Sequence, residues 1–519
     1  MRRRPHSLHA VRAHALQRPR EPQRARDVPR ERLPRASLTH SRRRQRRRAS
    51  QFVVARVVVV ALALVARERG RRRLALEAPA KEGPWTLQDA VGAPDWFEVS
   101  GQFRARFESL SERFKAIQDD GSGQIFVLRT LLAMTLKDEF LSLTTELEDS
   151  RAYGYPDDEL LSTGQVNAVE LLQAYVAANF TDTFTGDDEM RVKVGRQTMD
   201  MGSRRFVARN RYRNTINTFL GANARWESNT GSAVEAFFTH PTVRLPGFGD
   251  QAALRSNEIQ FDKEYAENKF WGLFGSHEEV VENVNAELYY YGLDRADVFN
   301  LAVADRELHT FGSRWYRPTA AGEPFWEIEY AYQFGESRST KAASNTTDLD
   351  HSAYLLHVSG GYAFDHSSAL KVEGMFDIAT GDSNPNDGQN NRFDSLFGVP
   401  RFEFGPTGIF RAFTRANIIS PGLRLTGNVV DDWQVQLTQR PYYLESKTDA
   451  WTTTGFRDDT GSSGRHVADV TEIRVRKPLL NGGARFEFGG AYLAMKQFAD
   501  NVGDGRDSIY TYAQISFNF

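Results

Sequence analysis

The chain has 519 residues, of which 12% are aromatic and 26% are charged, and its mean hydropathy is −0.52. This polar average excludes a helical membrane protein, because no apolar run approaches the roughly 20 residues that a membrane-spanning helix needs. The sequence contains no Cys, which excludes disulfides, thiolate metal sites and cysteine nucleophiles. The formal net charge of −1 hides an uneven distribution of charge along the chain.

Residues 1–80 differ in composition from the rest of the chain. They hold 23 Arg and 5 acidic residues, which leaves 43 basic and 62 acidic residues from Lys81 onward, a net charge near −19. The run RRRQRRR at 42–48 is typical of a disordered basic tail or a nucleic-acid arm. We favour a third interpretation, a secretory signal, because basic residues precede the apolar run 52–66 and small residues follow it.

This signal is imperfect, since Arg56 interrupts the apolar run and more arginines follow it closely. The next Met after Met1 is Met134, so a misplaced start of the chain is a further interpretation. We therefore predict two parts, an Arg-rich targeting segment at 1–80 and a single membrane domain at 81–519. No nucleic-acid partner is expected.

From Phe97 onward the chain becomes a series of alternating segments separated by Gly, Asn, Asp, Ser and Pro, the pattern of strands and turns. Apolar side chains occupy one parity of each segment and polar side chains the other. The apolar sets, in chain order, are Phe97, Val99, Phe103, Ala105 and Phe107; Leu141, Leu143, Thr145 and Leu147; Trp326, Ile328, Tyr330, Tyr332 and Phe334; Leu370, Val372, Gly374, Phe376 and Ile378; Trp433, Val435 and Leu437; and Thr471, Ile473 and Val475.

The last eleven residues, IYTYAQISFNF at 509–519, alternate in the same way and end the chain on an apolar Phe. An exposed apolar strand face is unfavourable in water. In a membrane barrel the apolar face contacts lipid and the polar face contacts an aqueous lumen. Several segments run to about ten residues, the length of a tilted strand that crosses the hydrocarbon layer, whereas soluble sandwiches use shorter strands. The prediction is an all-β fold, a transmembrane antiparallel β-barrel.

The length of the chain sets the number of strands. At roughly 24 residues per strand and connection, the chain after residue 80 has room for about 16–18 strands, and we prefer 18. Aromatic residues could supply the girdles at the two membrane interfaces. The candidates are Tyr289, Tyr290, Tyr291, Trp315, Trp326 and Tyr442.

Four stretches resemble the bacterial alginate-export family of outer-membrane proteins. They are MRVKVGRQTMDMGSRRFVARNRYRNTINTFLGANARW at 190–226, with its Gly195, Arg196 and Gln197; FDIATGDSNPNDGQNNRFDSLFG at 376–398; GAPDWFEVSGQFRARFESL at 92–110; and ELEDSRAYG at 146–154. The likeness spans almost all of residues 85–519 and departs only at the Arg-rich N-terminus. The final strand is also similar to the closing strand of such barrels, which implies that Phe517 and Phe519 take part in assembly and that the barrel-assembly machinery is a partner.

The resemblance implies a bacterial outer-membrane location and a passive conduit for alginate, a related anionic polysaccharide or a small anionic solute. Such a conduit needs a cationic lumen whose sites bind weakly and repeatedly, so that carboxylates exchange hydration for guanidinium groups and then leave. The alternation assigns to the luminal face Arg104, Arg106, Arg191, Lys193, Arg474, Arg476 and Arg485, and the family-like pattern adds Arg129 and Arg196. Because Glu98, Glu108, Glu146, Glu148, Glu472 and Glu487 share that face, purely structural Arg–Glu ladders are the alternative.

Two loops carry further signals. The stretch GDSNPNDG with Gly381, Asp382, Asn384 and Asp387 superficially resembles a calcium loop, but its Gly falls one place late. Phe393 stands where a bidentate Glu belongs, and Asp394 follows it, so we expect a turn-rich extracellular or pore-constricting loop and no metal. The second loop is basic, with Arg204, Arg205, Arg209, Arg211 and Arg213. It is a patch that faces lipopolysaccharide or the pore mouth, or a solvated loop.

Enzymatic interpretations have little support in the sequence. None of the 11 His falls in an HExxH pair, and there is no GxSxG motif, phosphate loop or nucleotide fingerprint. We therefore expect no catalytic residue and no cofactor. An outer-membrane lipase and an inert structural barrel are minor alternatives, and a general or substrate-selective uptake porin is the principal one, since a fold alone does not choose between import and export.

Overall fold

The computed structural model describes residues 83–118, 121–184, 186–298, 302–342, 344–430, 432–503 and 505–519. They belong to one compact unit that runs from Gly83 to Phe519. The predicted signal segment and the predicted boundary at residue 80 lie outside the described residues, so both stay predictions.

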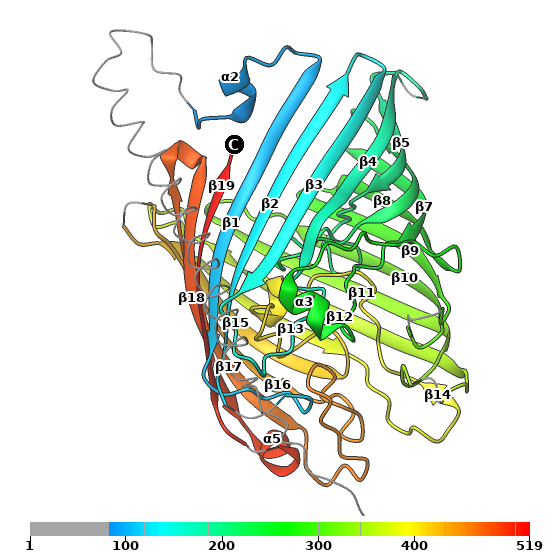
Figure 1. The fold of residues 1–519 in the computed structure, drawn as a ribbon, viewed down its shortest axis with the longest axis vertical. Coiled ribbons are helices and arrows are strands. Elements are labelled where there is room, and N and C mark those ends of the chain that lie inside the picture. Colours follow the sequence, from blue (N-terminus) through cyan, green and yellow to red (C-terminus); the bar gives the residue numbers. More distant parts are fainter. Residues whose placement is uncertain are drawn as a thin grey trace, which may run out of the picture. The chain divides into compact units, whose positions relative to one another are not determined.

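Eighteen long strands and one two-residue strand form a single closed sheet in the described part of the chain (Figure 1). The strands are β1 (Phe97–Leu110), β2 (Gly123–Lys137), β3 (Leu141–Tyr153), β4 (Asn167–Thr181), β5 (Glu189–Gln197), β6 (Phe219–Glu227), β7 (Ser232–Pro241), β8 (Asn268–Val281), β9 (Val284–Arg295), β10 (Arg306–Arg317), β11 (Glu323–Ser337), β12 (Leu349–Ala363), β13 (Lys371–Ala379), β14 (Gln389–Asn390), β15 (Ile418–Asn428), β16 (Gln434–Tyr443), β17 (His466–Leu479), β18 (Ala484–Met495) and β19 (Ser508–Asn518). The short helices are α2 (Leu87–Val91), α3 (Gln251–Ser256), α4 (Arg401–Phe404), η1 (Leu480–Gly482) and α5 (Gln497–Val502).

Each long strand pairs antiparallel with the next one, and β1 pairs with β19 to close the cylinder. The short β14 pairs in parallel with β12 beyond the end of β13, so β13 pairs directly with β15. These pairings confirm the predicted all-β barrel and the preferred count of 18 strands. No helix among the described residues has the length and apolar character to cross a membrane.

The closing seam joins the two ends of the barrel sequence. Ala105 lies opposite Ile515 and Phe103 opposite Phe517, so apolar residues from both strands share the outward face. Gly101 and Phe519 exchange backbone hydrogen bonds, with N···O distances of 2.6 and 2.9 Å. A Cβ atom at Gly101 would lie 2.2 Å from the Phe519 ring, so a larger residue there would force the terminal ring to shift. The roles of Phe517 and Phe519 in assembly stay predictions.

Burial follows the predicted alternation. On β1, Arg104, Arg106 and Glu108 are buried inside the barrel, whereas Phe107 is 43% exposed on the outside. Ile328 and Ile473 are likewise exposed on the outward face of their strands. The apolar parity therefore faces lipid, as the sequence predicts, and the polar parity faces the interior.

The aromatic candidates divide between the two faces. Trp315 lies outward, and Tyr290 and Trp326 share outward-facing positions on their strands. The girdle prediction is wrong for Tyr289, Tyr291 and Tyr442, which are buried inside the barrel. These rings point inward because loops that enter the barrel offer them an apolar surface, and Tyr289 also donates a hydrogen bond to Glu329 at 2.8 Å.

The connections at the two ends of the barrel differ in length. At the end that holds α2 and the C-terminus they are short, namely 138–140, 182–188, 228–231, 282–283, 318–322, 364–370, 429–433 and 480–483. At the opposite end they are long, namely 111–122, 154–166, 198–218, 242–267, 296–305, 338–348, 380–417, 444–465 and 496–507. Barrels of the outer membrane have short periplasmic turns and long extracellular loops, which places α2 and Phe519 on the periplasmic side (Figure 1).

A matched pair of substitutions tests the orientation of the faces. Ala513 lies on the lipid face between Phe107 and Phe488, whereas Ser100 is exposed on the inward face of β1. We expect Ala513→Arg to lower the free energy of unfolding by about 2–4 kcal/mol, because it puts a charge in hydrocarbon, and Ser100→Arg to change it little. Urea titration of the protein in lipid vesicles, followed by Trp fluorescence, measures both. Equal losses from the two variants would contradict the assigned faces.

Candidate functional site

Two long loops fold back into the barrel and meet there. They are residues 198–218, between β5 and β6, and residues 391–417, between β14 and β15. Val207 and Phe397 form a parallel bridge, and the Val399 amide donates to the Arg204 carbonyl at 3.1 Å. We call this pair of segments the interior loops.

An aromatic cluster covers one side of the interior loops. The Phe206 ring lies 5.3 Å from the ring of Tyr289 and 6.0 Å from that of Phe393, and the Phe397 ring lies 4.9 Å from that of Phe270. Tyr289 and Phe270 are inward-facing residues of β9 and β8. Burial of these rings therefore stabilises the loops against the wall of the barrel.

Three of the predicted luminal arginines hold the backbone of residues 198–218. Arg104 donates to the carbonyls of Arg211, Tyr212 and Arg213 at 2.8, 3.1 and 3.0 Å. Arg129 donates to the first and last of these carbonyls, each at 3.1 Å, and Arg106 donates to the middle one at 2.7 Å. Irregular backbone inside a barrel needs such donors, because its carbonyls have no strand neighbours. Arg104, Arg106 and Arg129 therefore position the loop.

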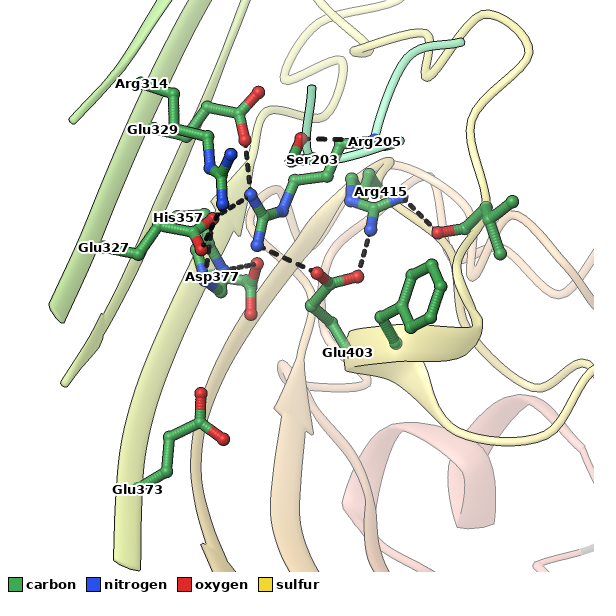
Figure 2. A network of polar contacts seen from close by, with 12 residues as sticks. Ser203, Arg205, Arg314, Glu327, Glu329, His357, Glu373, Asp377, Glu403 and Arg415 are labelled. Carbon is green, nitrogen blue, oxygen red and sulfur yellow. Dashed lines mark hydrogen bonds and ion pairs between the residues drawn. The ribbon is translucent and has the colours of Figure 1, made fainter. Parts of the chain in front are cut away.

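A buried ion network ties both interior loops to the wall. Figure 2 shows the guanidinium group of Arg205 between two carboxylates of β11, those of Glu327 and Glu329, and that of Glu403 in α4. The Arg205 Nη2···Glu403 Oε1 distance is 2.9 Å, and Arg415 forms a second ion pair with Glu403. One arginine thus links loop 198–218, loop 391–417 and the barrel wall.

The network continues along the wall. Arg314 of β10 pairs with Glu287 at 2.7 Å and with Glu327 at 3.0 Å. On the other side, Asp377 of β13 pairs with His357 at 2.8 Å and with Arg440 at 2.7 Å. Glu373 lies apart from this group in Figure 2 and pairs with Arg424 instead.

The charges of the two loop residues in this network reinforce each other. Burial opposes ionisation of Arg205, but the carboxylates of Glu403, Glu327 and Glu329 outweigh it and hold the pKa of Arg205 well above its ordinary value. Burial also disfavours the charged form of Glu403, yet Arg415 and Arg205 lower the pKa of Glu403. Both groups are therefore charged at neutral pH, and the loops depend on their attraction.

The other predicted luminal cations lie in the periplasmic half of the barrel. Arg191, Lys193, Arg476 and Arg485 take inward-facing positions and are accessible to water, and none of them forms an ion pair with any described residue. Arg474 pairs with Glu487 at 3.2 Å. The luminal prediction is wrong for Arg196, which lies opposite Leu220, a residue exposed on the outside, and pairs with Glu170 and Glu264.

A cavity of about 250 Å³ lies beside the interior loops. Its lining includes Gln102, Arg129, Glu146, Arg209 and Arg211. Arg209 pairs with Glu146, whereas the Arg211 side chain is 69% exposed and pairs with Asp200 at 3.2 Å. The basic loop thus lies inside the barrel, and the interpretations of it as a lipopolysaccharide-facing patch or a solvated loop are wrong.

The Asp/Asn-rich loop is held by hydrogen bonds. The Gly381 and Asp382 amides donate to carboxylates of Glu445 and Asp449 at 2.9 and 3.0 Å, and Asp387 accepts from the Gln389 amide. Asn384 makes local turn bonds, Phe393 packs on Phe206, and Asp394 pairs with Arg306. No group of three His, Asp or Glu side chains in the described ranges is arranged to hold a metal ion.

Several residues of the network have no counterpart in the predicted set. Arg314 and Arg440 share the inward parity of their strands, so the alternation could have indicated them. Glu403 and Arg415 lie in a loop without periodicity, and nothing in the sequence marks their partners.

Removal of Arg205 tests the network. We expect Arg205→Met to lower the free energy of unfolding by about 3–5 kcal/mol, because three buried carboxylates lose their shared partner. A second substitution, Glu329→Gln, should restore part of this loss, because Glu329 forms no other ion pair within the described residues. Urea titration measures the stability, and single-channel recordings should show a noisier current as the interior loops move.

The control for this test is the neighbouring residue Arg204, whose guanidinium lies over the Phe402 ring at 4.5 Å and forms no ion pair within the described chain. Arg204→Met should change stability by less than Arg205→Met. Equal effects of the two variants would show that the interior loops do not depend on the network.

Comparisons with known proteins agree with this architecture. The sequence profile of the alginate export family matches residues 95–507, and no curated protein matches the chain. In structure the chain is similar to OpdK of Pseudomonas aeruginosa (11% identity, TM-score 0.52, 81% of this chain and 98% of that one) and to OpdQ of the same organism (11%, 0.51, 82% and 97%). A structure of OpdK with vanillate is also similar (12%, 0.50, 81% and 98%).

At these identities the structural likeness shows the fold alone, that of outer-membrane channels. The family profile covers most of the sequence, and the described residues close a barrel of 18 long strands. The chain therefore belongs to the alginate export family, and it is a channel of the bacterial outer membrane.

Proposed function

We propose that this channel carries an anionic polysaccharide such as alginate, or a related anionic solute, out of the cell by passive diffusion through an arginine-containing lumen. The observation that carries the proposal is the set of four inward-facing cations without an ion pair to any described residue, Arg191, Lys193, Arg476 and Arg485. They lie on strands on both sides of the β1–β19 seam, in the half of the barrel that a periplasmic cargo reaches first.

The carboxylates on the same inward face are less free to cancel these charges. Glu235 pairs with Arg225, Glu487 with Arg474 and Glu373 with Arg424. A carboxylate of the cargo can therefore exchange its hydration for an unpaired cation without displacing an existing partner. Single exposed pairs of this kind contribute little binding energy, so each contact breaks easily and the cargo moves on.

Uptake of a small anionic solute is the second candidate. The interior loops occupy part of the barrel, which suits a small solute better than a polymer, and the structurally similar OpdK is known with bound vanillate, a carboxylate. For uptake, the four unpaired cations would each bind the single carboxylate of a small solute. A polymer would have to pass the interior loops on its way through the barrel.

Ion selectivity tests the proposal. In planar bilayers with a salt gradient, the reversal potential of the unmodified protein should indicate a preference for chloride over potassium. Substitution of all four free cations by Gln should bring the permeability ratio toward unity, because the lumen loses four positive charges. Alginate oligosaccharides on the periplasmic side should block the unmodified channel more strongly than the variant.

The control is Lys477→Gln, which removes a charge next to Arg476 from a side chain that lies over the Trp433 ring. It should leave the reversal potential unchanged. A preference for cations in the unmodified protein would contradict the anionic cargo and favour a general porin.

A further inference from the structure

Five cations on five different extracellular connections interact electrostatically, since the charge of Arg411, in addition to burial, lowers the pKa of each of the other four. They are Lys115 (connection 111–122), Arg213 (198–218), Arg244 (242–267), Lys341 (338–348) and Arg411 (380–417). None of them belongs to the predicted luminal set, and only Arg213 was singled out in the sequence, as a member of the basic loop. We call this group the outer cation cluster.

Neutral oxygen atoms hold three members of the cluster in place. Arg213 Nη2 and Arg244 Nη1 donate to the same amide oxygen, Asn217 Oδ1, at 2.6 and 3.0 Å. Lys115 Nζ donates to the carbonyl of Ile409 at 3.0 Å, two residues before Arg411. The side chains are therefore positioned without being neutralised.

The cluster lacks the carboxylate partners that buried cations usually have. None of its five members forms an ion pair with any residue that the structure describes, although most arginines of the interior do. Arg411 and Lys341 are exposed to solvent, and the other three are half-buried, so all five are accessible to water.

The cations are close enough to repel one another. Burial, and next to it the charge of Arg411, lower the pKa of Lys115 to about 8. Burial and the charge of Arg244, followed by that of Arg411, lower the pKa of Arg213. Glu148 and Asp262 attract Arg244, but neither reaches ion-pair distance. Like charges held together in this way raise the energy of the empty site and attract anions to it.

Residues 211–213 of the interior loops lie between this cluster and the cavity of about 250 Å³. Arg211 faces that cavity, whereas Arg213 belongs to the outer cluster, and Arg104 holds the carbonyls of the three residues from Arg211 to Arg213. The loop therefore presents cations on both of its sides.

We propose that the outer cation cluster is a second anion-binding site, which takes carboxylate groups of a polyanionic sugar chain on the extracellular side of the interior loops. This inference rests on the proposed function, because it assigns to the exported chain a site that receives it beyond Arg211. Several carboxylates spaced along one chain match a cluster of several cations better than a single carboxylate does, since each added contact is intramolecular once the first has formed.

The test uses full-length channels inserted in one orientation in a planar bilayer. Alginate oligosaccharides added to the extracellular side should block the current, and glucuronate should block it only at much higher concentration. The double variant Arg411→Gln and Lys341→Gln should raise the half-blocking concentration from that side roughly three- to tenfold, the effect of losing two water-accessible ion pairs.

Two controls separate this site from the rest of the channel. Lys447→Gln removes an exposed cation from another extracellular connection and should not change the block. Arg211→Gln should weaken block from the periplasmic side alone. An unchanged half-blocking concentration in the double variant, or an equal change in Lys447→Gln, would overturn the outer site.

The two proposals fail separately. Absence of block from the periplasmic side together with cation selectivity would refute the proposed export function. Block from the extracellular side that still depends on Arg411 and Lys341 would then support an outer site that serves another anion. Heat-dependent migration on gels verifies that each variant is a folded barrel, so that a loss of block is not a loss of structure.

Discussion

Every backbone N–H and C=O group that crosses the hydrocarbon layer must find its partner within the protein, and for strands only a closed sheet achieves this. The pairing of β1 with β19 supplies that closure, and it leaves the barrel with two faces in two different media. Phe107 and Arg106 are neighbours in the chain, yet one meets lipid and the other lies buried inside. The alternation of the sequence follows from this single constraint.

The same requirement recurs inside the barrel, where the interior loops have no strand neighbours. A guanidinium group has five N–H donors in a fixed plane and stays charged, so one arginine serves several carbonyls at once. Arg104 and Arg129 do this for the residues from Arg211 to Arg213. Arg205 instead gathers carboxylates from β11 and α4. Arginines that a sequence indicates as a cargo path are therefore partly the means by which the loops are fixed.

This division explains how far the sequence predicted the molecule. Alternation depends on local geometry, so the fold, the number of strands and the inward position of Arg104, Arg191 or Arg476 could be predicted. What an inward side chain contacts depends on loops far away in the sequence, and these have no period. The sequence therefore indicated an interfacial position for Tyr289, although its ring lies inside the barrel against Phe206. Glu403 and Arg415, which are close in sequence, pair because α4 and its loop enter the barrel.

The cations without carboxylate partners differ from the paired ones in what they lose when they bind a cargo carboxylate. A paired arginine such as Arg205 cannot take a cargo carboxylate without giving up existing partners, of which Glu329 has no other ion pair within the described residues, whereas Arg476 or Arg411 has no such partner to lose. Free cations occur on both sides of the segment from Arg211 to Arg213, near the periplasmic turns and among the extracellular connections. A polyanion held weakly at one set can reach the other only past the interior loops. The bonds that hold those loops, rather than the strength of either set, therefore determine how readily a chain passes.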